Sequence, residues 1–148
     1  MTPIETLRKV FGFTSFRSGQ EKAIDALVQG RDVLAVMPTG SGKSLCYQIP
    51  AHISRQRTVI VAPLVALIDD QVSALGRLGV NAEKIHSLVS REENVDAWKR
   101  FKRGTTKILY LSPERLMSKD MLEALGSLDI GMFVVDEAHC VSKWGPSF

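Results

Sequence analysis

Residues 33–44 have the sequence VLAVMPTGSGKS, in which an apolar run leads directly into a glycine-rich turn that ends in lysine and serine. The run Val33–Val36 predicts a buried strand, and the apolar residues Leu45 and Tyr47 predict a helix after the turn. A strand, a glycine-rich turn and a helix in this order are the context in which a P-loop binds phosphate. The pattern departs at its first position, where Met37 replaces the usual glycine. This stretch therefore predicts an α/β domain that binds a nucleotide.

The turn itself supplies the groups that bind a nucleotide phosphate. Gly40 and Gly42 allow backbone conformations in which successive N–H groups point at phosphate oxygens, and the following helix adds partial positive charge at its N-terminus. The side chain of Lys43 is expected to reach the outer phosphates of ATP, and the hydroxyl of Ser44 to coordinate Mg²⁺. The residues of the turn predicted to bind ATP are Thr39, Gly40, Ser41, Gly42, Lys43 and Ser44.

Further apolar runs alternate with helical patterns along the chain. They are Thr58–Ala62, Lys107–Leu111, Met132–Val135 and a weaker run at Ala82–His86. Apolar residues at helical spacing across 64–78 predict a helix that ends at Gly79. Ser90 with Glu93 predicts a capping box for a second helix, and Ser112–Pro113 is typical of the start of a third. Apolar strands that alternate with helices indicate an α/β fold with a parallel sheet covered on both faces.

Two acidic residues directly follow the last of these strands. Ligands bind beyond the carboxyl ends of the strands in open α/β sheets, and Asp136 and Glu137 lie at such an end. Asp136 is predicted to hold Mg²⁺ and Glu137 to orient and activate the attacking water, and with Lys43 they form the predicted catalytic set. Ala138 and His139 complete the sequence DEAH, and His139 is predicted to link the nucleotide to a second site.

The composition indicates a globular protein of about one domain. The 148 residues are 45% hydrophobic and 24% charged, and the net charge of +3 permits a polyanionic partner without requiring one. Cys46 and Cys140 are too few for a disulfide framework and lack metal-ligand spacing. The N-terminus has no apolar signal segment, and the most apolar stretch, at 58–68, is too short to cross a membrane. We expect a protein that is not secreted and has no membrane partner, cytoplasmic in a bacterium or nuclear in a eukaryote.

With the P-loop and DEAH together, the chain resembles the superfamily 2 helicases, and its longer motifs resemble those of the RecQ DNA helicases. The motifs that carry the resemblance are Leu7, Phe11, Gly12, Phe13, Phe16, Arg17 and Gln20; MPTGSGKSLCYQIPA at Met37–Ala51; YLSPERL at Tyr110–Leu116; and DEAHCVSKWG at Asp136–Gly145. The resemblance implies a RecA-like ATP-binding domain, with an adenine-recognition segment at 1–30 and a core from the P-loop to DEAH at 31–148. It also implies an ATP-dependent DNA helicase of repair or recombination, with ATP and Mg²⁺ as cofactors and single-stranded or forked DNA as partner.

The first motif is implied to recognise adenine through Phe13, Arg17 and Gln20. The amide of Gln20 can pair with the N6 and N7 edge of adenine, and Arg17 could stack on the same base. The residues alone leave an alternative open, in which Gln20 simply begins the helix that continues through Ala23 and Leu27. The resemblance favours adenine binding.

The last motif is similar to the start of an aromatic-rich loop with which RecQ helicases sense single-stranded DNA. Trp144 offers a stacking surface, worth about 1–3 kcal/mol per base in single-strand binders, and Lys143 adds a positive charge. With His139 they form the implied set of DNA-binding or coupling residues. The chain departs from the family at Pro146 and Ser147, where a polar pair is usual. Signalling through this loop is therefore the part of the resemblance that the sequence supports least.

The family also implies parts that residues 1–148 do not supply. A second RecA-like domain is needed for full activity because it provides an arginine finger, so the chain alone is expected to be inactive or very weak. In the family's fold a strand beyond DEAH inserts between Val33–Val36 and Met132–Val135. We therefore expect no ladder between these two runs and marginal stability for the chain alone. Ala62 and Ala66 replace the family's serines, which removes hydroxyl contacts expected to DNA phosphate.

Two other functions remain open. An RNA helicase of the same superfamily would share the P-loop and DEAH, although the stretch Cys140–Gly145 argues against it. From a different class, the chain could be a nucleotide-dependent module that binds nucleic acid without motor activity. Detecting strand separation by this polypeptide alone would exclude the second alternative.

Overall fold

The computed structural model describes residues 1–38, 40 and 42–140. The chain divides into two compact units, Met1–Arg55 and Gln56–Phe148, which we call the N-terminal and C-terminal units. Each unit has its own buried side chains, and each is described separately below. Within the described residues, no helix is both long enough and apolar enough to cross a bilayer.

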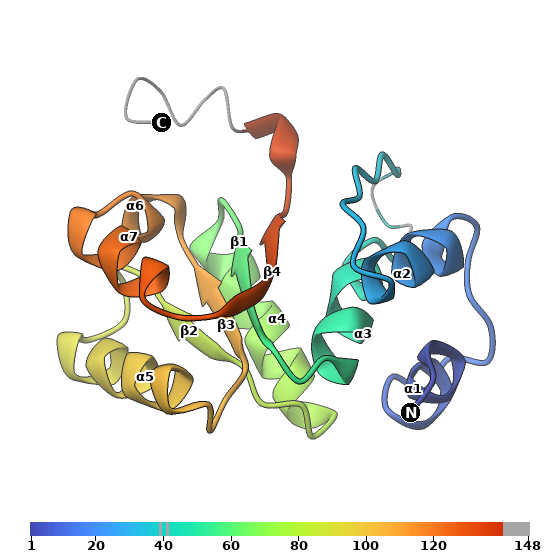
Figure 1. Ribbon diagram of the computed structural model, residues 1–148, viewed down its shortest axis with the longest axis horizontal. Coiled ribbons are helices and arrows are strands. Elements are labelled where there is room, and N and C mark those ends of the chain that lie inside the picture. The colour runs from blue at the N-terminus through green and yellow to red at the C-terminus, as the bar shows by residue number, and fades with distance from the viewer. Residues whose placement is uncertain (39, 41, 141–148) are drawn as a thin grey trace. The chain divides into compact units, whose positions relative to one another are not determined.

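The N-terminal unit contains three helices, α1 (Pro3–Lys9), α2 (Gln20–Val28) and α3 (Leu45–Ile53) (Figure 1). Helix α1 begins with a capping box, in which Thr2 and Glu5 satisfy each other's backbone N–H groups. Helix α3 packs against both α1 and α2. The side chains buried in this unit include Leu7, Ile24 and Ile49. Helix α3 starts directly after the glycine-rich turn, as the sequence predicts.

The strand predicted at Val33–Val36 is wrong for this structure. These residues have no regular secondary structure, and the side chains of Leu34 and Val36 are 83% and 89% exposed. A parallel strand is stabilised by ladder hydrogen bonds to a neighbouring strand. None of the strands in the described part of the chain pairs with this run, so its apolar pattern does not become a strand.

The C-terminal unit is an α/β structure with a four-stranded parallel sheet in the order β2-β3-β1-β4. Its elements are β1 (Arg57–Val61), α4 (Val65–Arg77), β2 (Glu83–Ile85), α5 (Arg91–Arg103), β3 (Ile108–Leu111), α6 (Pro113–Leu116), α7 (Lys119–Gly126) and β4 (Ile130–Val135). The remaining predicted strands and the three predicted helices are all confirmed. The predicted α/β class and parallel sheet are confirmed as well.

Helices cover both faces of this sheet (Figure 1). Because side chains alternate along a strand, Val59 and Leu109 point to one face, where they form a core with side chains of α5, α6 and α7. Tyr110 belongs to the opposite face, where its hydroxyl donates to Gln71 Oε1 of α4 at 2.8 Å. A strand buried on both faces has little room for polar side chains, which explains the nearly continuous apolar runs in the sequence.

Local hydrogen bonds fix where the helices of this unit begin and end. The hydroxyls of Ser90 and Ser112 accept from backbone N–H groups at the starts of α5 and α6, which confirms both residues as N-caps. For Ser90 this is one of the two hydrogen bonds of the predicted capping box. The hydroxyl of Ser118 accepts in the same way at the start of α7, which the sequence interpretation did not anticipate. At the other end of α5, Arg57 donates to two terminal carbonyl oxygens at 3.0 and 2.6 Å, and Gly104 adopts a left-handed C-cap with φ of 81°.

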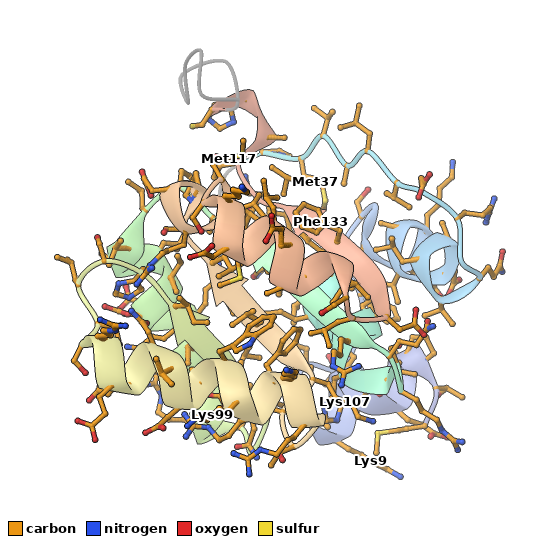
Figure 2. All side chains as sticks on the ribbon, turned by 60° about the vertical axis from the view of Figure 1, so that its left-hand side comes forward. Lys9, Met37, Lys99, Lys107, Met117 and Phe133 are labelled. Carbon is orange, nitrogen blue, oxygen red and sulfur yellow. The ribbon has the colours of Figure 1, made fainter. Side chains whose placement is uncertain are left out.

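Strand β4 is an edge strand in the part of the chain that the structure describes. It pairs with β1 on one side, and no described strand pairs with its other side. Figure 2 labels Phe133 on β4, and this residue is 50% exposed. Because Val33–Val36 does not form a strand, the strand order expected around Met132–Val135 stays a prediction.

Candidate functional site

Two glycines of the glycine-rich turn in the N-terminal unit have the backbone conformation that the sequence predicts for them. Gly40 and Gly42 have φ values of 79° and 77°, in the left-handed region that glycine tolerates better than other residues. The carbonyl of Gly42 accepts from the N–H of Leu45 at 3.2 Å, which begins the hydrogen bonds of α3. Thr39 and Ser41 lie outside the described residues. The turn therefore leads into a helix N-terminus, where backbone N–H groups favour an anion.

Lys43 and Ser44 occupy the two positions directly before α3, and both are partly buried. Ser44 is the N-cap residue, but its side chain makes no capping hydrogen bond. A serine at this position usually satisfies a backbone N–H of the first turn. Its hydroxyl is therefore not committed to the helix, as coordination of a cation would require.

Arg17 and Gln20, two of the residues predicted to bind adenine, contact the glycine-rich turn itself. Arg17 Nη1 donates to the carbonyl of Gly40 at 2.9 Å, and Gln20 Nε2 donates to the carbonyl of Gly42 at 2.9 Å. Gln20 Oε1 in turn accepts from the N–H of Arg17 at 2.8 Å. Gln20 is the first residue of α2 and is 1% exposed. Both sequence interpretations of Gln20 missed this contact, which joins residues 22 positions apart.

A pocket of about 560 Å³ lies beside the start of α2. Its lining residues are Phe16, Arg17, Ser18, Gly19, Glu21, Lys22 and Asp25. Of the residues predicted to bind adenine, only Arg17 lines it. The Phe13 side chain is 49% exposed, and its backbone N–H donates to Leu7 at the end of α1. The structure therefore brings Arg17 and Gln20 to the glycine-rich turn, and among the described residues it shows no corresponding contact for Phe13.

The methionine that departs from the P-loop pattern has a packing role. Met37 Sδ lies 3.7 Å from Cys46 Sγ, the donor of an S–H contact. Met37 Cε also lies 3.8 Å from the position that a Cβ on Gly19 would take. Burial raises the pKa of the Cys46 thiol, and the thiol remains protonated at neutral pH. Met37 thus fills space between the start of α2 and the first turn of α3.

In the C-terminal unit, the acidic pair continues directly from β4. The N–H of Asp136 donates to the carbonyl of Val61 at 2.9 Å, so Asp136 is tied to the central strand β1. Its Oδ1 accepts from the N–H of Glu137 at 2.8 Å. Glu137 has φ of 54° and is the only non-glycine residue with positive φ in the described part of the chain. Such backbone strain occurs most often at functional sites, which makes Glu137 a strong candidate.

His139 lies beside Glu137, as the sequence interpretation requires. His139 Nε2 is 3.3 Å from Glu137 Oε2, and the His139 side chain is 70% exposed. The predicted residues Lys143 and Trp144, and the departures at Pro146 and Ser147, lie outside the described residues. Of the alanines that replace serines in the family, Ala62 is buried and Ala66 is exposed.

The chain is similar to known helicases in sequence and in fold. A family model described as DEAD/DEAH box helicase matches residues 17–148. The chain is 41% identical to the ATP-dependent DNA helicase RecQ of Pasteurella multocida, over 99% of this chain and 23% of the relative. It is 45% identical to the probable ATP-dependent DNA helicase RecS of Bacillus subtilis, over 97% of this chain and 29% of the relative. The chain thus spans less than a third of either relative.

Solved structures show the same fold at low sequence identity. A hypothetical ATP-dependent RNA helicase from Sulfolobus tokodaii has a TM-score of 0.78 and 23% identity, over 97% of this chain and 43% of that one. The helicase MrfA bound to DNA and AMPPNP has a TM-score of 0.71 and 23% identity, over 94% of this chain and 21% of that one. These likenesses confirm the RecA-like helicase fold predicted from the sequence.

Proposed function

Since the chain belongs to the DEAD/DEAH box helicase family, we propose that it forms part of a RecQ-like enzyme that couples ATP hydrolysis to DNA strand separation. The observation that carries the nucleotide half of this proposal is the glycine-built turn at the start of α3, with Arg17 and Gln20 on its carbonyls. The relatives named DNA helicases, similar over nearly the whole chain, support the DNA half.

ATP is proposed to bind with its phosphates at the glycine-rich turn. Backbone N–H groups of the turn and the N-terminus of α3 would bind the phosphate oxygens. Lys43 would neutralise the outer phosphates, which carry most of the charge that develops during phosphoryl transfer. Thr39 and Ser41 are proposed as further ligands of the phosphates. Phe13 is proposed, with Arg17, to contact the base.

Ser44 and Asp136 are the residues proposed to hold Mg²⁺. The hydroxyl of Ser44 does not cap its helix, and a carboxylate with a hydroxyl is an oxygen donor set that suits this ion. The described residues contain no group of three or more potential His, Cys, Asp or Glu ligands. Nucleotide phosphates and water would complete the coordination, because Mg²⁺ usually keeps several waters and binds substrate phosphates. The ion would neutralise charge on the phosphates during hydrolysis.

Glu137 is proposed to orient and activate the attacking water. Its backbone is held by its N–H donation to Asp136 and by the carbonyl that accepts from Cys140 at 2.9 Å. A fixed backbone limits where the Glu137 carboxylate can lie, which favours the positioning role. His139, 3.3 Å from its carboxylate, is proposed to connect ATP hydrolysis to DNA through Lys143 and Trp144.

The proposed partner is single-stranded or forked DNA during repair or recombination, and a second RecA-like domain is proposed to complete the ATP site. ATP hydrolysis by the protein that contains this chain tests the proposal. We expect hydrolysis that single-stranded DNA stimulates more than RNA of the same sequence. Stronger stimulation by RNA would favour the RNA helicase, and hydrolysis with no stimulation by either would contradict a nucleic-acid motor.

A further inference from the structure

The amide of Gln20 is engaged on both of its sides. Its Nε2 donates to the carbonyl of Gly42 at 2.9 Å, and its Oε1 accepts from the N–H of Arg17 at 2.8 Å. Gln20 is 1% exposed, and both hydrogen bonds are partly buried, so the amide is already engaged in this conformation. Gln20 therefore makes structural contacts within the protein in the absence of nucleotide.

The consequence of the bond to the Gly42 carbonyl follows from the geometry of a peptide group. The Gly42–Lys43 peptide is trans, and in a trans peptide the C=O and the N–H point in opposite directions. When Gln20 binds the Gly42 carbonyl, it holds the Lys43 N–H on the side that faces away from Gln20. We propose that Gln20 is a positioning residue for the phosphate site, because it fixes the peptide whose N–H precedes the P-loop lysine. This role rests on the proposed function, in which the turn binds the phosphates of ATP.

A second anchor holds the same turn. Arg17 Nη1 donates to the carbonyl of Gly40 at 2.9 Å, two residues before the carbonyl that Gln20 binds. The Arg17 N–H is itself bound by Gln20 Oε1, so the two anchors support each other. We call Arg17 and Gln20 together the carbonyl clamp. Because Gln20 holds the Gly42–Lys43 peptide from the carbonyl side, the Lys43 N–H on the opposite side would be directed towards a phosphate.

The close approach at Gly42 shows how tightly the clamp fits. A Cβ added to Gly42 would lie 2.6 Å from Gln20 Nε2, and the φ of 77° already disfavours any side chain. Glycine is thus needed at this position for the Gln20 contact as well as for the turn. The carbonyl of Gly42 also accepts from the N–H of Leu45, so Gln20 couples the turn to the first hydrogen bond of α3.

The clamp and adenine recognition predict different consequences for ligands without a base. A residue that only recognises adenine has no effect on inorganic tripolyphosphate. A residue that positions the phosphate site affects tripolyphosphate, ATP and GTP by the same factor. The test is therefore the affinity of the protein that contains this chain for these three ligands with Mg²⁺, measured by calorimetry. The Lys43→Ala variant identifies the part of the tripolyphosphate signal that comes from the P-loop.

Gln20→Met keeps the length of the side chain and removes both hydrogen-bonding groups. We expect it to weaken tripolyphosphate, ATP and GTP alike, by about three- to tenfold for the loss of a buried hydrogen bond. Gln29→Ala is the matched control, because it removes an exposed glutamine at the other end of the same helix, and we expect no change in any of the three affinities. Backbone hydrogen exchange should become faster in residues 40–44 of Gln20→Met but not within α1, a difference that general destabilisation would not produce.

Arg17→Met tests the clamp at an exposed side chain, where folding is not at risk. We expect a loss of tripolyphosphate affinity, and the contact with the base proposed for Arg17 would add a further loss for ATP and GTP. If either variant weakens ATP while tripolyphosphate affinity is unchanged, that residue recognises the base and the clamp is overturned. If the unaltered protein binds neither tripolyphosphate nor ATP, the proposed function fails, and the clamp fails with it.

Discussion

His139 Nε2 lies 3.3 Å from Glu137 Oε2, and the two side chains differ greatly in exposure, at 70% and 27% respectively. Another molecule can therefore contact the exposed imidazole of His139, and through it influence the less exposed carboxylate of Glu137. Glu137 also has the strained φ of 54°, so its position depends on the contacts around it. A molecule that moved His139 would change the environment of the group proposed to activate water.

Replacing Glu137 by glutamine separates nucleotide binding from hydrolysis. Gln keeps the size of the side chain and an oxygen that can accept from His139, but it cannot take a proton from water. We expect Glu137→Gln to bind ATP and Mg²⁺ with nearly unchanged affinity while turnover falls by about 10²-fold or more. Equilibrium binding and single-turnover hydrolysis measure the two quantities. A parallel fall in both would identify Glu137 as a metal ligand or a structural residue.

The charge of Lys43 is expected to matter for both binding and hydrolysis. Lys43→Ala removes the lysine that precedes α3 without removing the carbonyl of residue 43, which accepts from Cys46 at 3.0 Å. The helix should therefore persist, and circular dichroism can check this. We expect much weaker nucleotide binding and loss of hydrolysis in the protein that contains this chain. Near-normal hydrolysis by this variant would show that the phosphates bind elsewhere.

The sequence was most informative for the C-terminal unit. Its strands are buried on both faces, so the runs at Thr58–Ala62 and Lys107–Leu111 are apolar throughout and could be recognised locally. Ser90 and Ser112 marked helix starts for an equally local reason, since an N-cap bonds a residue three positions away. The strand at Val33–Val36 could not be judged in the same way, because a parallel strand exists only where a partner provides a ladder.

The candidate site shows the same division between local and distant contacts. The positive φ values of Gly40 and Gly42 follow from the glycines themselves, and the position of the acidic pair follows from its place directly after β4. The bond between Gln20 and Gly42 joins residues 22 positions apart, and no periodicity or motif spacing indicates it. One interpretation of Gln20 from sequence concerned adenine, and the other concerned the start of its own helix. Neither predicted a contact with the glycine-rich turn.

Glu83 gives the C-terminal unit a stability that should depend on pH. Arg100 donates to its two carboxylate oxygens at 2.8 and 2.9 Å, and Thr106 donates to one of them at 2.7 Å. Burial raises the pKa of Glu83, but the hydrogen bonds from Arg100 and Thr106 outweigh it and leave the pKa below its ordinary value. A lowered carboxyl pKa stabilises the fold above the unfolded pKa, and this stability is lost as the pH falls through the folded pKa.

Arg100→Gln is therefore expected to lower the free energy of unfolding by about 1 kcal/mol at neutral pH, since the pair is partly exposed. The difference in the free energy of unfolding between this variant and the unaltered protein should shrink in acid, because Glu83 is then protonated in both proteins. Urea unfolding measures this difference in the free energy of unfolding at two pH values, one neutral and one below the pKa of Glu83. Lys99→Gln removes a neighbouring exposed charge from the same helix and serves as the control. A difference of equal size at both pH values would mean that Arg100 acts through packing alone.

Trp144 is expected to affect the response to DNA more than the basal reaction. If a base stacks on it, Trp144→Ala loses about 1–3 kcal/mol of single-strand binding. Stimulation of ATP hydrolysis by single-stranded DNA should then require more DNA or reach a lower maximum, while the unstimulated rate changes little. An unchanged stimulation curve would remove Trp144 from the proposed set of coupling residues.

Strand separation tests the central proposal most directly. A forked DNA duplex with a fluorophore and a quencher on its two strands reports separation by the protein that contains this chain. We expect ATP with Mg²⁺ to drive strand separation. No separation is expected when the protein is given a non-hydrolysable ATP analogue, or when the Glu137→Gln variant is given ATP, although the protein should bind DNA in both experiments. Rapid ATP hydrolysis in the presence of bound forked DNA, with no strand separation, would contradict the assignment of this chain to a DNA-unwinding motor.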